Sequence, residues 1–244
     1  MKKILKLTLI TITTIILTTL GANILVLADA GLNATTQGDV QFTLDYSDPE
    51  VIIPGEPGIP GEPETGTPPP EIYGPLRIDF VSNFDFGIQY LNDSTGGLFY
   101  ANTQRWVGDI PNSPLFAQVT DLRGTQEGWR LTLLQPEQFR NLDGFLRGAQ
   151  LRFQNVSVTN TSGQLPTQSM PAILEPGVLT EVANAASSHG MGTTHVLFGT
   201  IENALGDTTP DVQLSVPEYA LPAGTEDLIF QTTLLWVLEN TPQD

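Results

Sequence analysis

Short runs with an apolar residue at every second position, separated by turn residues, dominate this sequence from residue 75 onward and restrict its fold most strongly. Leu76, Ile78 and Phe80 form the first run. Others follow about every ten to twenty residues, in "LFAQVTDL", "GWRLTLL", "AQLRFQNVSV", "HVLFGT", "VQLSVP" and "IFQTTLLWVLEN". Period-two alternation between turn signals is typical of antiparallel strands with one buried face. The pattern predicts an all-β protein, a β-sandwich of Ig-like or Greek-key type with about nine or ten strands.

Helical patterns are scarce in the same region. The segments "PEQFRNLDG" (136–144) and "TEVANAASS" (180–188) lack alternation, and each is expected to form one helical turn at most. No long helix is therefore predicted after the N-terminal stretch.

The first 30 residues have the layout of a secretory signal peptide. Three lysines among the first six residues precede an uncharged apolar stretch at 7–28, and "ADA" at 28–30 matches the small-x-small pattern of signal peptidase sites. Cleavage is expected after residue 30 or residue 28. The alternative is an uncleaved membrane anchor, because the stretch is long enough to span a bilayer.

Removal of the signal peptide leaves a strongly acidic chain. All three lysines are lost with it, so seven arginines face 26 acidic residues, a formal charge of about −19. Such a surface repels nucleic-acid phosphates and anionic lipids, which excludes both as partners. The absence of cysteine excludes disulfides and thiolate chemistry and, in an exported protein, points to a Gram-positive bacterium.

Composition divides the exported part into three segments. Residues 31–51 form an N-terminal strand segment, in which "DVQFTLDY" at 39–46 alternates apolar and polar residues. Residues 52–74 are rich in Pro, Gly and Glu, and we expect an extended, poorly ordered linker there. Residues 75–244 contain all the later strand-like runs and are expected to form the folded domain.

Catalytic signals are weak. The two histidines, His189 and His195, have no neighbouring acidic cluster and are expected to be structural residues rather than metal ligands. The Ser-His neighbours in "SSHGMG" would point to opposite faces of a strand, so they form no catalytic dyad. "LPAGT" at 221–225 lacks the threonine of a sortase signal, and no apolar segment or basic tail follows it. We therefore predict that the protein is not an enzyme.

Four aspartates near predicted turns are the remaining metal candidates. They are Asp79, Asp85, Asp93 and Asp121. Calcium would bridge such residues in a spaced loop of the D-x-D-x-D-G kind, which is absent. We expect solvated turn acids, with no metal and no cofactor.

Two tryptophans are the most informative residues. Trp129 and Leu131 lie two apart in one run, as do Trp236 and Leu238 in the last run, so each pair shares a face of its strand. Each ring either fills the core or is exposed as a platform for sugar. Because each tryptophan continues a face of leucines, we favour the core.

The order of these segments resembles the WxL-domain family of Gram-positive surface proteins. The resemblance rests on "DVQFTLDYSDPEVIIPGEP", "LRIDFVSNFDFG", "VTDLRGTQEGWRLTL", "LRGAQLRF", "GMGT", "LSVP" and "TTLLWVLENTP". The first family motif is Trp-x-Leu after Asp-x-Arg-Gly, matched here by Asp121, Arg123, Trp129 and Leu131. The second is matched by Trp236 and Leu238. These residues are the binding residues that the resemblance implies.

The resemblance implies a secreted protein of the cell surface, held non-covalently on the wall by a domain that binds peptidoglycan. No C-terminal anchor is then needed. Family members often occur with a membrane-anchored WxL-interacting protein, so the alternative is a scaffold or adhesion component that docks mainly onto such a companion. A third possibility, a secreted glycosidase, has no motif that singles out a carboxylate pair.

Arginines are the candidates for contacts with the wall. An acidic protein gains nothing from long-range attraction to an anionic wall, so its binding requires short-range contacts. Arg123, Arg130 and Arg152 are candidates for peptide carboxylates. Arg130 alternates with the Trp129 face and is expected on the outer side of its strand.

Overall fold

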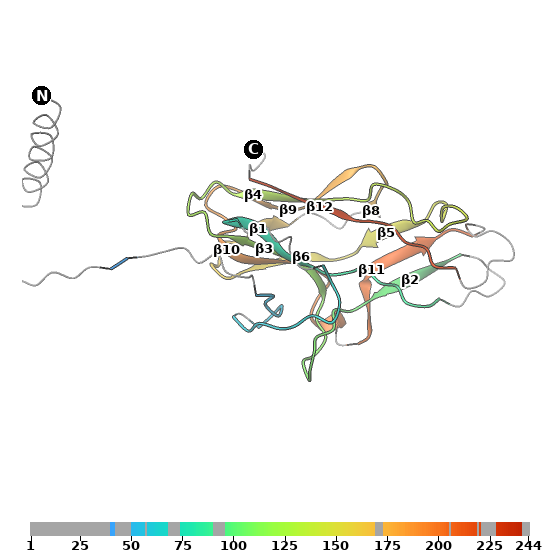
Figure 1. Ribbon diagram of the computed structural model, residues 1–244, viewed down its shortest axis with the longest axis horizontal. Helices are drawn as coiled ribbons and strands as arrows, with labels where there is room; N and C mark the ends of the chain where they lie inside the picture. Colours follow the sequence, from blue (N-terminus) through green and yellow to red (C-terminus); the bar gives the residue numbers. More distant parts are fainter. Residues whose placement is uncertain are drawn as a thin grey trace, which may run out of the picture. The chain divides into compact units, whose positions relative to one another are not determined.

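Strands make up almost all the regular secondary structure of the described chain (Figure 1). The computed structural model describes residues 40–41, 50–56, 58–67, 74–89, 96–168, 173–204, 206–218, 220 and 228–240. The strands are β1 (Leu76–Val81), β2 (Gly97–Asn102), β3 (Leu115–Asp121), β4 (Trp129–Leu134), β5 (Gln150–Phe153), β6 (Val156–Asn160), β7 (Thr167–Gln168), β8 (Ile173–Leu174), β9 (Leu179–Ala185), β10 (Gly192–Phe198), β11 (Thr208–Val216) and β12 (Leu235–Glu239). One 3-10 turn, η1 (Glu202–Ala204), is the single helical element in these ranges.

The strands form three four-stranded antiparallel sheets. Their orders are β1-β3-β10-β6, β2-β11-β5-β8 and β12-β4-β9-β7, which we name the β3, β11 and β4 sheets after a central strand of each. Buried side chains from all three sheets pack into one hydrophobic cluster. The prediction of an all-β, sandwich-like protein is therefore confirmed, with a few more strands than expected.

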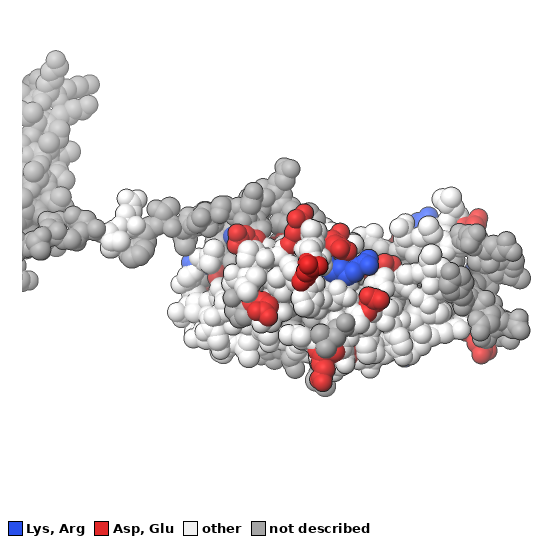
Figure 2. All heavy atoms as spheres, turned by 90° about the horizontal axis from the view of Figure 1, so that it is seen from below, with Lys and Arg blue, Asp and Glu red and all other residues white. Residues whose placement is uncertain are grey.

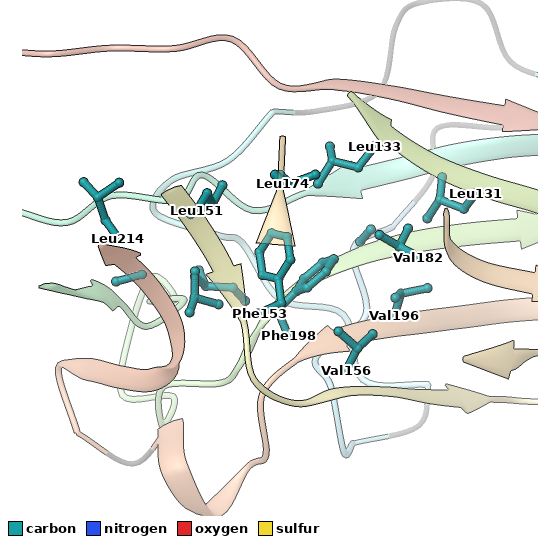
Figure 3. Packing of buried hydrophobic residues seen from close by; sticks show 14 of the residues in the cluster. Leu131, Leu133, Leu151, Phe153, Val156, Leu174, Val182, Val196, Phe198 and Leu214 are labelled. Carbon is teal, nitrogen blue, oxygen red and sulfur yellow. The ribbon is translucent and has the colours of Figure 1, made fainter. Parts of the chain in front are cut away.

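Aromatic rings fill the main core where the three sheets meet (Figure 3). Phe153 of β5 and Phe198 of β10 are fully buried, and their ring centroids lie 4.9 Å apart. Phe84, which follows β1, packs 5.4 Å from each of them. Leu131 and Leu133 of β4 close the cluster from the third sheet. Burying such large apolar side chains removes them from water, which contributes most to the stability of the fold.

β3 is buried on both of its faces, and this creates a second, smaller core. Ala117 and Val119 face the main core, while Phe116 faces the opposite side. There Phe116 packs with Phe80 and Trp106, whose ring stacks on it at 5.9 Å. A strand covered on both sides needs a layer outside its sheet, and the Pro/Gly-rich segment supplies part of that layer.

The expectation of a poorly ordered linker at 52–74 is wrong for its described residues. Ile53 is buried in the second core, and the backbone N–H of Ile52 donates to Gln118 Oε1 at 2.8 Å. A second buried amide, Gln104, donates from Nε2 to the carbonyl of Thr65 at 3.0 Å. The composition favoured a linker, but apolar contacts and hydrogen bonds with Gln118 of β3 and with Gln104, which follows β2, hold the segment against the domain.

Glycine is required in this segment because the chain passes close to aromatic rings. A Cβ on Gly61 would lie 2.6 Å from the Trp106 ring, and one on Gly66 would lie 2.2 Å from the Phe80 ring. Gly66 also has φ of +140°, a conformation that other residues rarely adopt. The glycines that suggested flexibility thus allow tight packing.

Neither segment expected to form a helical turn does so. Residues 136–144 contain no helix, and most of 180–188 belongs to β9. The pairing of β9 with β4 shifts register at Leu131 and Thr132, so Val182 and Ala183 are both buried. This bulge removed the strict alternation that would have identified a strand.

Two expectations fall on residues outside the described ranges. They are the signal peptide at 1–30 and the strand at 40–46, of which only Val40 and Gln41 are described. In the part of the chain that is described, no helix has the length and apolar character needed to cross a membrane.

Candidate functional site

The two Trp-x-Leu motifs lie on neighbouring strands, although about a hundred residues separate them. β4 and β12 pair antiparallel, with Trp236 opposite Leu133 and Leu238 opposite Leu131. Directly opposed residues share a face of the sheet. The motifs therefore form one apolar strip on the core side of the β4 sheet.

Trp129 is fully buried, so our preference for the core over a sugar platform is confirmed for this residue. Its indole Nε1–H donates to the carbonyl of Gly190 at 3.1 Å, which satisfies the one polar atom of the side chain. Gly190 has φ of +72°, and a Cβ there would lie 2.6 Å from that nitrogen. The first glycine of "GMGT" thus makes room for the indole.

Trp236 is partly buried and covers the same core from the edge of the sheet. Its ring meets Phe198 edge-on at 5.7 Å, and Phe84 lies 6.5 Å away. Leu234 and Leu238 on the same face are also partly buried against the cluster. The second motif is therefore a cover of the core rather than a free aromatic platform.

Asp121 and Arg123 form a buried clasp at the end of β3. Arg123 donates from Nε to Asp121 Oδ1 at 3.0 Å and from Nη2 to Oδ2 at 2.8 Å, and the two side chains are 10% and 3% exposed. The guanidinium also reaches the carbonyl of Gly128, just before Trp129, at 2.6 Å and that of Asn240, just after β12, at 3.5 Å. The hydrogen bonds that Arg123 donates to the Asp121 carboxylate raise the pKa of Arg123 above its usual value. The clasp fixes the loop that leads into the first motif.

Two of the four aspartates expected to be solvated turn acids are instead buried. Asp121 is held by Arg123, and Asp79 accepts hydrogen bonds from Arg77, Gln118 and Thr120. Asp85 is exposed and caps a turn, as expected, and Asp93 lies outside the described residues. The burial of Asp79 and Asp121 was not predicted from the sequence. Asp79 interrupts its strand and Asp121 ends its strand, and the apolar alternation that identified each strand lies on the other face.

Arg130 lies on the side of β4 away from Trp129, as its position in the alternation predicted. It pairs through Nε and Nη2 with Glu239, its direct neighbour on β12. Arg152 belongs to a different sheet, on β5. The residues predicted for binding are therefore not assembled into a single pocket.

The third tryptophan and an open groove were not singled out from the sequence. Trp106 anchors the second core, and its Nε1–H donates to Ser113 at 3.2 Å. The groove runs between residues 136–143 and 228–233, where Thr232 donates to the carbonyl of Glu137. Its borders come from two irregular segments that lack any periodic signal.

Neither histidine has the surroundings of a metal ligand. His189 is exposed, and its Nδ1 lies 3.0 Å from the carbonyl of Ser187. His195 is buried on β10, with Nε2 3.2 Å from Gln118 Oε1 and its ring edge-on to Phe116. Within the described ranges, no three His, Asp or Glu side chains gather as a potential metal site.

His195 should make the fold sensitive to acid. Burial lowers the pKa of His195 from 6.5 to about 4, so between these values the unfolded chain takes up a proton that the folded chain does not. Stability is then lost as the pH falls through this window. Between pH 7.5 and pH 5, the wild type should lose about 2 kcal/mol more unfolding free energy than His195→Gln in urea titrations. His189→Gln should behave like the wild type; equal losses in all three proteins would contradict this prediction.

Comparison with known proteins identifies the family. The family model described as WxL domain surface cell wall-binding matches residues 29–242, which is most of the chain. Comparison with curated proteins and with solved structures gave no significant match. The match spans both Trp-x-Leu motifs, the clasp and the Pro/Gly-rich segment. The chain therefore belongs to the WxL domain family, whose members are surface proteins that bind the bacterial cell wall non-covalently.

Proposed function

We propose that the wall polymer held by this domain is peptidoglycan and that the domain binds without catalysing a reaction on it. The family match carries the wall attachment, and the charge distribution supports the choice of polymer. The chain has a formal charge of −17, and Figure 2 shows acidic side chains scattered over one face with basic ones at few points. At long range, the protein is therefore repelled by an anionic polymer such as teichoic acid.

The arginines strengthen this reasoning. The described residues contain all seven arginines of the chain and none of its lysines. Within the described ranges, five of the seven have a carboxylate oxygen within 4 Å: Arg77, Arg105, Arg123, Arg130 and Arg140. Binding by hydrogen bonds and apolar contacts to sugar and peptide groups fits such a surface better than binding by a cationic patch.

The purified protein should sediment with peptidoglycan sacculi from which protein and teichoic acid have been removed. Chaotrope should release it, because no covalent bond is formed. Removal of teichoic acid, or a moderate rise in salt, should leave binding unchanged or strengthen it, since like-charge repulsion is removed or screened. A cationic binder would show the opposite salt trend. No soluble wall fragments should be released during the incubation; their release would contradict the non-catalytic proposal.

A second candidate is docking onto a companion WxL-interacting protein. The observation in its favour is the position of β12, which carries the second motif and lies at the edge of the β4 sheet in the described chain. An edge strand offers backbone N–H and C=O groups to a strand of another protein. Failure to bind stripped sacculi, combined with binding to such a companion, would replace the peptidoglycan proposal with this one.

A further inference from the structure

The outer face of the β11 sheet carries a row of chemically distinct side chains. Tyr100 of β2, Gln213 of β11, Arg152 of β5 and Ile173 of β8 lie directly opposite one another in register. Their neighbours along each strand point into the core, so alternation places all four on the outside. Tyr100 and Ile173 are 42% and 47% exposed. An aromatic ring, an amide, a guanidinium and an aliphatic group thus share one face of the sheet.

Arg152 differs from the other arginines proposed for binding. Arg123 and Arg130 are held by Asp121 and Glu239, whereas Arg152 has no carboxylate within ion-pair distance in the described chain. Its Nη2 donates to Gln150 Oε1 at 2.7 Å, and its buried Nε has no hydrogen-bond partner in the part of the chain that the structure describes. Although the chain has 27 acidic residues, none of those described pairs with the charge of this guanidinium, and most of its N–H donors make no hydrogen bond to the described residues.

The neighbouring amide side chains are fixed by hydrogen bonds of their own, and they are uncharged, so they do not neutralise the Arg152 charge. Gln213 donates from Nε2 to the carbonyl of Pro210 at 2.8 Å and accepts a bond from Gln154 at 3.3 Å. These contacts leave each side-chain amide group able to make a further hydrogen bond to a ligand. A planar guanidinium between neutral amides is complementary to a ligand that has one carboxylate next to amide groups. The row carries a single positive charge, which is too little to bind a polyphosphate.

We propose that this face binds the peptide stem of peptidoglycan, with Arg152 pairing with a stem carboxylate. Gln150 and Gln213 then face the amide groups of the stem, and Tyr100 contacts its apolar part. The proposal rests on peptidoglycan being the wall ligand. It names the part of the polymer that is recognised and the surface that recognises it, which lies on a different sheet from the two Trp-x-Leu motifs.

The test compares two arginine variants on native sacculi stripped of teichoic acid. Arg152→Gln should weaken binding roughly ten- to a hundredfold, because a charge-assisted hydrogen bond is lost. Arg147→Gln is the matched control: it removes the same charge from an exposed arginine close in sequence that also has no ion-pair partner among the described residues, and it should bind within about twofold of the wild type. Equal binding by both variants would overturn the proposal.

A second arm uses sacculi whose carboxylates have been converted to amides with a carbodiimide. Wild-type binding should fall to the level of Arg152→Gln, and the variant should show no further loss. The comparison of wild-type binding to untreated and to amidated sacculi remains decisive even if Arg152→Gln does not fold. Unchanged wild-type binding to amidated sacculi would overturn this inference and leave the peptidoglycan proposal intact. Wild-type protein that binds only walls retaining teichoic acid would refute both.

Discussion

Replacing Trp129 with alanine is expected to lower the free energy of unfolding by about 3–5 kcal/mol, the largest effect of any single change considered for this chain. The side chain is fully buried, contacts the main core and satisfies its indole N–H at Gly190. Its removal leaves a large cavity that a rigid sandwich fills only in part. Urea unfolding followed by circular dichroism measures the loss.

The control is Tyr100→Ala, which removes an aromatic side chain that is 42% exposed and should cost far less stability. Wall binding by Trp129→Ala should fall only in proportion to the folded fraction. A Trp129→Ala protein that remains as stable as the wild type but no longer binds sacculi would show that the indole contacts the wall directly, contrary to its place in the core.

Replacing Asp121 with asparagine should cost about 3 kcal/mol, because the largely buried Arg123 guanidinium then keeps only the exposed Glu127 carboxylate, 3.6 Å away, as an ion-pair partner. The pair connects the end of β3 with the backbone on either side of the β4 and β12 pairing, at Gly128 and Asn240. Loss of the clasp should therefore loosen the strands that carry both motifs. Thermal unfolding and hydrogen exchange at the β4 amides report this change.

A double-mutant cycle separates the pair from its surroundings. Asp121→Asn combined with Arg123→Gln should be less destabilising than the sum of the two single changes. The double variant carries no charge at either position, so no buried charge loses its partner. Glu64→Gln is the exposed counterpart: it breaks the 3.3 Å contact with Arg105, in which the two side chains are 43% and 58% exposed, and should cost about 0–1 kcal/mol. Similar losses for Asp121→Asn and Glu64→Gln would contradict the clasp.

Local patterns in the sequence determined the fold class and the inward face of the main strands. Alternation placed Trp129 and Leu131 on one side of β4 and Arg130 on the other, and the structure agrees. Such predictions succeed because side-chain direction in a strand depends only on the position along that strand. The same period-two rule identifies Phe116 as facing away from Ala117, once β3 is known to be covered on both sides.

The Pro/Gly-rich segment shows where composition misleads. Its glycines and prolines are typical of a linker, yet Ile53 and the glycines beside Trp106 and Phe80 pack it onto the β3 sheet. Three of the four strands of the sheet that receives it, β3, β6 and β10, come from residues far along the chain. Nothing in the segment itself reveals that surface.

The surroundings of Arg130 and Arg152, two of the three candidate arginines, were decided only by tertiary structure. Alternation gives the face that an arginine occupies, but whether a carboxylate lies beside it depends on which distant strand is its neighbour. β12 brings Glu239 to Arg130, and β11 and β8 bring only neutral residues to Arg152. Arg123 differs, because it meets Asp121, two residues before it, within the turn after β3. Side-chain direction is a local property of the backbone, whereas charge pairing across a sheet depends on contacts made only when the whole chain has folded.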